Sequence, residues 1–342
     1  MKDNKQNIDF LIIGIKIIRW YKLNGRKLPW RNTKNPYFIW ISEIILQQTQ
    51  VRQGWEHYLR FTERFPDIKT LAKAHTDEVL LYWKGLGYYS RAINLHKAAQ
   101  QIMNNFGGIF PSSYKEILAL KGVGKYTAAA VSSICFNEKK PAVDGNFYRV
   151  FSRVFADDFD ISNSKAFEYF SNLALMTMPQ NNCGDFNQGI MDIGSEICKP
   201  KNPSCEVCPI AEHCLAFSTG TSLSFPVKTK KIKIQNLSLT YFFIFYDNQF
   251  LVQQRDKTSI WKKLFEFPTK IDQELLSYQT NEQRIKHKLT HKNLEITIKI
   301  IKPNKAEIFL KAAKNYIIMD TAKAHLHSFP KPLQNFYEQF FK

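Results

Sequence analysis

The sequence predicts an all-α region followed by a smaller α+β domain. Helix-period apolar patterns, separated by Gly, Asn and Pro, run from residue 8 to the cysteines near residue 200. A Ser/Thr-rich and then lysine-rich stretch interrupts them, and alternating apolar segments follow from residue 240. We therefore expect residues 1–216 to form the helical region, 217–236 a basic linker and 237–342 the second domain.

The composition indicates a folded protein that binds a polyanion. A chain of 342 residues allows two or three domains with cores of their own. The net charge of +18 favours nucleic acid as the partner, although a lysine-rich proteome would produce the same excess. Residues 8–18 are apolar, but Asp9 and Lys16 interrupt them and they are too short to span a bilayer. We therefore expect no membrane partner. Four of the six cysteines crowd near residue 200 and do not suggest a secreted disulfide framework, which favours a reducing, cytoplasmic compartment.

Five helices are expected before residue 110, and three of them have a start or stop signal. Asn24-Gly25 ends the first helix, and Asn35-Pro36 caps the second with proline at its first position. Gly107-Gly108 closes the last. The predicted helices cover residues 8–22, 37–46, 53–65, 77–84 and 92–106.

Residues 112–146 read as helix, tight turn, helix and loop. Ser113 and Glu116 form a capping box that starts the first helix, and Gly122-Val123-Gly124 breaks it. The second helix is expected over residues 125–134. Backbone N–H groups at its start suit a DNA phosphate, although an ordinary αα-hairpin has the same pattern.

Two acidic residues are candidates for acid–base chemistry. Glu43 lies on an otherwise apolar helix, where burial would raise its pKa and make it a general acid. The alternative is a solvent-facing glutamate on an amphipathic helix. Asp144 follows the hairpin in a Val-Asp-Gly-Asn loop. The amide run 47–50 could bind base edges, and the glycine-bounded turn 85–91 could wedge into a base stack.

The C-terminal segments include both strand-like alternation of apolar residues and helix-like spacing of apolar residues. Residues 240–255 read as a β-hairpin with Asp247-Asn248 in its turn, and residues 296–301 and 316–320 as further strands. Residues 273–289 and 333–341 read as helices.

Four of the six cysteines have metal-site spacing. Cys198, Cys205, Cys208 and Cys214 form a C-x6-C-x2-C-x5-C pattern, and soft sulfur selects either iron–sulfur or zinc. Zinc ribbons use two C-x2-C pairs, whereas this loop contains one. Cys135 and Cys183 lack such spacing and are expected to be small buried apolar groups.

Together these motifs resemble the MutY-type adenine DNA glycosylases of the helix–hairpin–helix superfamily. The resemblance rests on LPWR, SEIILQQTQV, GLGYYSRA, the hairpin, VDGN and the cysteine loop, and it covers nearly the whole chain. It implies a 4Fe–4S cluster on the loop 198–214 and a Nudix-like C-terminal domain. One departure is Lys121, which stands where the family usually has proline.

The resemblance also implies roles for individual residues. Glu43 would protonate adenine, and Asp144 would stabilise or attack the sugar. Tyr126 stands where bifunctional relatives have a nucleophilic lysine, so efficient AP lyase activity is not expected. The remaining residues with implied DNA contacts or supporting roles are Arg26, Leu28, Trp30, Arg31, Gln48, Thr49, Val51, Leu86, Tyr88, Gly122, Val123, Gly124, Asn146, Gln188, Thr290 and His291.

The C-terminal domain is expected to read the lesion rather than to hydrolyse nucleotides. IWKKLFEFP resembles a family strand, but the acidic helix of an active Nudix hydrolase is missing. Leu289-Thr290-His291 resembles the family's Phe-Ser-His loop, with leucine in place of phenylalanine. The expected partner of this monomer is double-stranded DNA with adenine opposite 8-oxoguanine or guanine, in the bacterial nucleoid. Alternatives are another mismatch glycosylase of this superfamily and a non-catalytic iron–sulfur DNA-binding protein.

Overall fold

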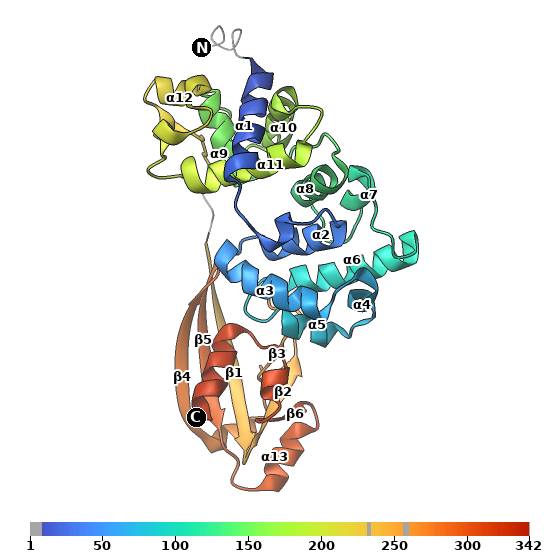
Figure 1. The fold of residues 1–342 in the computed structure, drawn as a ribbon. Helices are drawn as coiled ribbons and strands as arrows, with labels where there is room; N and C mark the ends of the chain where they lie inside the picture. The colour runs from blue at the N-terminus through green and yellow to red at the C-terminus, as the bar shows by residue number, and fades with distance from the viewer. Residues whose placement is uncertain (1–8, 231–233, 256–259, 342) are drawn as a thin grey trace. The chain divides into compact units, whose positions relative to one another are not determined.

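The computed structural model describes residues 9–230, 234–255 and 260–341, which divide into two compact units (Figure 1). One unit comprises residues 1–73 and 94–231, and the other comprises residues 74–93 and 232–342. A helical N-terminal region and a sheet-containing C-terminal domain confirm the predicted fold class. The boundary at 231/232 falls inside the predicted linker, whereas the assignment of 74–93 to the second unit was not expected. None of the helices in the described ranges has the length and apolar character needed to cross a bilayer.

The N-terminal region contains the expected helices and several more. Asp67 accepts a hydrogen bond from the backbone N of Thr70 at 2.6 Å and starts α4, a short helix that the sequence analysis missed. The helices are α1 (Phe10–Asn24), α2 (Pro36–Ile45), α3 (Val51–Arg64), α4 (Ile68–Lys73), α5 (Thr76–Tyr82), α6 (Ser90–Phe106), α7 (Tyr114–Leu118), α8 (Lys125–Phe136), α9 (Gly145–Val154), α10 (Ala166–Thr177), α11 (Cys183–Asp192) and α12 (Leu215–Ser218).

Local signals set the ends of these helices as predicted. The Asn35 side chain accepts from the backbone N of Tyr37, with Pro36 in the first turn of α2. Ser113 and Glu116 form the complete capping box of α7. A buried apolar cluster joins α1, α9, α10 and α11 through side chains such as Ile17 and Phe186. This cluster fixes α9, whose start carries Asp144 and Asn146, and α11, which carries Gln188.

The second unit contains a six-stranded mixed sheet. Its order is β3-β2-β1-β5-β4, and β6 pairs with β2. β1 and β5 are parallel, with Tyr241 opposite Ile298, and the other pairs are antiparallel. The predicted hairpin is present, and Asp247 in its turn has φ of 49°. The strands are β1 (Gln235–Tyr246), β2 (Gln249–Gln254), β3 (Phe265–Glu266), β4 (Gln279–Lys288), β5 (Lys292–Ile301) and β6 (Ile317–Asp320).

Helices cover both faces of this sheet. Alternating side chains place Phe243 in a cluster with Phe336 of α14 (Lys331–Phe340), and Ile244 in a second cluster with Phe309 of α13 (Ala306–Ala313). The ring centroids of Phe243 and Phe336 lie 5.1 Å apart. The prediction of a helix over 333–341 is therefore confirmed, whereas α13 was not predicted.

The predicted helix over 273–289 is wrong. Residues Gln273–Tyr278 form a 3-10 helix and β4 follows, paired antiparallel with β5. β4 lies at the sheet edge, and most of its polar side chains are exposed. A polar, lysine-containing edge strand lacks the apolar alternation of a half-buried strand, so pairing with β5 overrides the local pattern.

The segment before the second unit is held against the helical region. The backbone N of Ile161 donates to the carbonyl of Val227 at 3.0 Å. The hydroxyl of Thr229 donates to the Asp160 carboxylate, and the backbone N of Lys230 donates to Ser162 Oγ at 3.2 Å. Residues 227–230 thus have a fixed course, while residues 231–233 of the predicted basic linker lie outside the described residues.

Candidate active site

One cavity of about 220 Å³ in the helical unit collects most of the predicted site residues. They come from the 3-10 turn Pro29–Arg31 and its approach, from α2 and the start of α3, and from α8, α9 and α11. Eleven predicted residues line the cavity: Arg26, Leu28, Trp30, Arg31, Glu43, Thr49, Val51, Tyr126, Asp144, Asn146 and Gln188. The sequence analysis did not name Ser42, Met191 and Ser195, which line it as well.

Glu43 is the buried acid of this cavity. Its residue surface is 8% exposed, and apolar neighbours on α2 are buried with it. Burial raises the pKa of Glu43 to about 7, although a hydrogen bond with Tyr126 and the charge of Arg31 act in the opposite direction. The solvent-facing alternative is therefore wrong. A carboxyl group with this pKa is partly protonated at neutral pH and can donate a proton.

Asp144 faces the same cavity as the N-cap of α9. Its Oδ1 accepts from the backbone N of Phe147 at 2.8 Å, and its Oδ2 accepts from Asn146 Nδ2 at 3.0 Å. Burial raises the pKa of Asp144, whereas these hydrogen bonds and Arg149 favour the charged form. The helix start therefore fixes the orientation of both carboxylate oxygens.

Tyr126, near the start of α8, lines the same cavity as the two acids. Burial and the nearby carboxylates raise the pKa of Tyr126 well above 10, so the phenol is protonated at neutral pH. Its hydroxyl donates to Met191 Sδ at 3.0 Å and also forms a hydrogen bond with Glu43. A phenol has one proton, so it can donate to the sulfur while Glu43 is protonated and can donate to the carboxylate once Glu43 is ionised, which is the form that this hydrogen bond favours.

Two of the cavity's arginines, Arg26 and Arg31, form an ion-pair cluster with Asp192, a residue that the sequence analysis missed. Asp192 is fully buried and contacts both Arg26 and Arg31. Its oxygens accept from Arg31 Nη1 at 2.5 Å and Nη2 at 2.9 Å, and from Arg26 Nε at 2.7 Å. A usable signal existed, because Gln188 and Asp192 are four residues apart and share one face of α11.

A π-helical turn over Ile193–Ile197 follows α11, and its Gly194 packs closely against Asn146 in the first turn of α9. Arg149 Nη2 donates to Asn146 Oδ1 at 2.7 Å and to the carbonyl of Gly194 at 2.6 Å, and its Nε donates to the carbonyl of Cys198 at 2.7 Å. Arg149 thus joins the neighbour of Asp144 to the start of the cysteine loop. Turns of this kind are common at functional sites.

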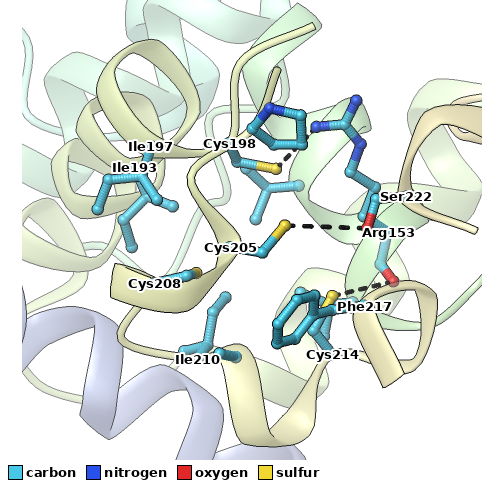
Figure 2. A pocket seen from close by; sticks show the side chains of 14 residues that line it. Arg153, Ile193, Ile197, Cys198, Cys205, Cys208, Ile210, Cys214, Phe217 and Ser222 are labelled. Atoms are coloured by element: carbon cyan, nitrogen blue, oxygen red, sulfur yellow. Dashed lines mark hydrogen bonds between the residues drawn. The ribbon is translucent and has the colours of Figure 1, made fainter. Parts of the chain in front are cut away.

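The four spaced cysteines line a second cavity in this unit (Figure 2). Its other walls are largely apolar, and Arg153 Nη1 donates to Cys198 Sγ at 3.3 Å. All four are free thiols. In the part of the chain that the structure describes, no group of three or more His, Cys, Asp or Glu side chains is arranged to hold a metal ion. Four thiols around one apolar cavity suit an iron–sulfur cluster, whose donors are cysteine sulfurs.

The remaining cysteines differ from each other. Cys183 is fully buried in the apolar cluster of α1 and α11, as predicted, whereas Cys135 is only partly buried. Burial raises the pKa of the Cys135 thiol to about 12.

The helix–hairpin–helix turn has the predicted shape. Gly122 has φ of 78°, and a Cβ there would lie 2.5 Å from the Cβ of Asn94. Gly124, by contrast, has φ of −96° and is the N-cap of α8 without a side-chain capping bond. The backbone N of Lys121 donates to Gln101 Oε1 at 3.0 Å, a bond that the family's usual proline could not make. Phosphate binding by this turn stays a prediction.

The other predicted DNA-contact residues lie outside the cavity. Gln48 and Tyr88 have positive φ of 57° and 45°, a conformation uncommon for residues other than glycine. Leu86, expected in the wedge, is 7% exposed. Thr290 and His291 occupy the turn between β4 and β5 in the second unit, where the Thr290 hydroxyl is hydrogen-bonded to the hydroxyl of Tyr88. Their DNA contacts stay predictions.

Comparisons with known proteins agree with the domain order. Residues 41–174 match the HhH-GPD superfamily base excision DNA repair protein model, 240–339 match a NUDIX domain, and 198–214 match the iron–sulfur binding domain of endonuclease III. Adenine DNA glycosylase of Buchnera aphidicola subsp. Schizaphis graminum is 35% identical over 95% of this chain and 97% of its own. The same enzyme of Buchnera aphidicola subsp. Baizongia pistaciae is 40% identical over 87% and 88%. A thermostable thymine-DNA glycosylase structure covers 64% of this chain and all of its own, at 32% identity and a TM-score of 0.58.

Proposed function

Because the chain belongs to the adenine DNA glycosylases, we propose that its substrate is duplex DNA in which adenine is mispaired with 8-oxoguanine or guanine. The enzyme hydrolyses the N-glycosidic bond of that adenine and acts as a monomer on the bacterial nucleoid. The observation that supports the proposal best is the buried Glu43 carboxyl, whose pKa is about 7, in one cavity with Asp144. This pairing of a proton donor with a second carboxyl group suits cleavage of a glycosidic bond.

Glu43 is the general acid in this proposal. Adenine leaves a sugar poorly as an anion, so protonation at N7 lowers the barrier to bond cleavage. The apolar surroundings on α2 keep part of Glu43 protonated at neutral pH, and its contact with Tyr126 holds the carboxyl group in place. As the C–N bond breaks, the electron pair of the bond moves onto the base, which takes the proton.

Asp144 supports the positive charge that develops on the sugar. Its carboxylate is held by the backbone N of Phe147 and by Asn146, so it need not reorganise during the reaction. Asp144 either stabilises the oxocarbenium-like sugar or forms a transient bond with it, and water completes the hydrolysis.

Tyr126 makes the enzyme monofunctional. A phenol with a pKa well above 10 has no amine with which to form a Schiff base on the abasic sugar. Base removal is therefore not followed by efficient strand cleavage.

The 4Fe–4S cluster of this family fits the thiol-lined cavity, and Cys198, Cys205, Cys208 and Cys214 would hold it. The bound cluster supplies iron–thiolate bonds that tie the loop to the end of the π-helical turn. Arg149 then connects this loop to Asn146 within the chain itself.

We assign recognition of the opposite base to the second unit. Adenine is a normal base, so the signal for repair must come from the other strand. 8-Oxoguanine differs from guanine by an O8 acceptor and an N7–H donor, and Thr290 offers a hydroxyl in the turn between β4 and β5.

Cleavage of labelled duplexes tests this function. Purified protein is incubated with adenine opposite 8-oxoguanine, adenine opposite guanine and thymine opposite guanine, and abasic sites are then opened with alkali. We expect excision of adenine from the first two duplexes only, and loss of excision in Glu43→Gln with binding retained. Release of thymine instead would favour a thymine-specific enzyme, and binding without any excision would favour a non-catalytic DNA-binding protein.

A further inference from the structure

Asp192 is a buried carboxylate that makes an unusual number of contacts with cations. It is 0% exposed, yet it accepts two hydrogen bonds from the Arg31 guanidinium, at 2.5 and 2.9 Å. It also contacts Arg26 Nη2 at 2.6 Å and accepts from the backbone N of Arg26 at 3.1 Å. These contacts lower the pKa of Asp192 although burial opposes them, so it is ionised at neutral pH.

Arg31 needs this partner because it has little contact with solvent. Its side chain is 8% exposed and lies over the ring of Tyr21, with 5.3 Å between the guanidinium carbon and the ring centroid. It lines the same cavity as Glu43, and its charge lowers the pKa of that acid. A buried guanidinium without a carboxylate is costly and would turn toward another anion in the cavity.

We propose that Asp192 is a positioning residue that fixes the Arg31 guanidinium at the cavity wall and offsets its charge toward Glu43. The planar fork of Arg31 matches the two carboxylate oxygens, so both its place and its direction are set. The inference rests on the proposed role of Glu43 as the general acid. Without Asp192, Arg31 would favour ionised Glu43, and the acid would lose its proton at a lower pH.

The groups around Glu43 determine whether its pKa rises or falls when Arg31 changes position. Burial on α2 raises its pKa, and Asp144 at the start of α9 raises it further. Arg31 from the 3-10 turn and the hydrogen bond with Tyr126 of α8 lower it. Cys135 of α8 also senses the charge of Glu43, but burial raises its own pKa to about 12, so its thiol stays neutral. Arg31 is thus the cation among these groups, and Asp192 controls its position.

The pH dependence of single-turnover excision tests the proposal. Wild-type, D192N, R31Q and D192N/R31Q proteins are compared from pH 5.5 to 9 with adenine opposite 8-oxoguanine and enzyme in excess. D192N should move the basic limb down by about one pH unit or more, because a charge within a few ångströms shifts a pKa by that amount. Its rate should then fall about tenfold below wild type at pH 8 and less than about twofold at pH 5.5. R31Q should move the limb in the opposite direction.

The double variant and E43Q separate the possible failures. If Asp192 acts through Arg31, D192N/R31Q should share the midpoint of R31Q, and a lower midpoint would overturn the proposal. A uniform loss of rate in D192N at every pH, without a shift, would also overturn it. If the melting curve shows that D192N does not fold, the midpoints of R31Q and the double variant are compared to test whether Asp192 acts through Arg31. If E43Q stays active, Glu43 is not the general acid, and the proposed function itself is refuted. If E43Q is inactive but the pH profile of D192N is not shifted, only the role inferred for Asp192 is refuted.

Discussion

The substitution Gly194→Ala in the π-helical turn should displace the hydrogen-bond partner of Asp144 at the start of α9. A Cβ at this position would lie 2.6 Å from the Cβ of Asn146 and 3.1 Å from its Cγ, which is closer than non-bonded carbons approach. The Cβ of Asn146 is next to its backbone, so a change of rotamer cannot relieve the contact. In Gly194→Ala the π-helical turn or the start of α9 must therefore move, and the 3.0 Å bond from Asn146 to Asp144 is lost.

The size of the effect follows from that bond. A hydrogen bond to a charged group contributes about 1.5–3 kcal/mol. If Asp144 needs this bond most in the transition state, the excision rate should fall about 10- to 150-fold. Asn146 also accepts from Arg149 at 2.7 Å, so losing both bonds would place the effect toward the upper end.

Single-turnover excision at pH 6 with saturating enzyme measures the chemical step without the contribution of DNA affinity. Gly145→Ala is the matched control, because it lies next to Asp144 and a Cβ there meets no atom within 4 Å. We expect the control to keep the wild-type rate and both variants to keep the wild-type melting temperature within a few degrees. Equal rates for the two alanine variants would refute the role of close packing at Gly194.

Five further outcomes are expected. Glu43→Gln should lower the rate of adenine excision by about 10²- to 10⁴-fold. The wild-type rate should be flat below pH 7 and fall about tenfold per pH unit above it, because Glu43, with a pKa of about 7, loses the proton that it donates. Cys208→Ser should reduce iron and sulfide content and lower the melting temperature, both measurable on anaerobically purified protein. Tyr126→Lys should increase the protein–DNA adduct trapped by borohydride, which would stay absent if the amine cannot reach the sugar. Deletion of 237–342, or Thr290→Ala, should reduce the ratio of excision opposite 8-oxoguanine to that opposite guanine, and an unchanged ratio would place lesion reading elsewhere.

Local signals were sufficient for much of the helical region. The capping box at Ser113 and the Asn35-Pro36 start depend on residues within one turn of each other, so the sequence predicts them well. These helix starts could be predicted because the interactions that form them are local in sequence. The apolar neighbours of Glu43 on α2, by contrast, left burial and exposure of this acid both open, and the packing of the helix decided between them.

Features that depend on distant partners were missed. β4 is a strand because β5 pairs with it, and its own polar sequence favours a helix. Asp192 shares a face of α11 with Gln188, but its role becomes apparent only when Arg26 and Arg31, more than 160 residues away in the sequence, are brought to it. The turn 193–197 closes with wider hydrogen-bonded rings than an α-helix, and no residue pattern announced it.

That π-helical turn changes the direction in which side chains point from the helix axis, so the residues before it and the residues after it face different sides. A π-helical turn is geometrically an α-helix with one residue added, and each residue rotates the following side chains by about 100°. Met191 before the turn therefore faces the cavity that contains Glu43, while Cys198 after it faces the cavity of the four thiols. Deletion of one residue between 193 and 197 would restore α-helical winding and turn one of the two ends away from its cavity. Deleting a single residue from this stretch should therefore be more harmful than many substitutions within it. The number of residues between Asp192 and Cys198 is thus constrained independently of their identity.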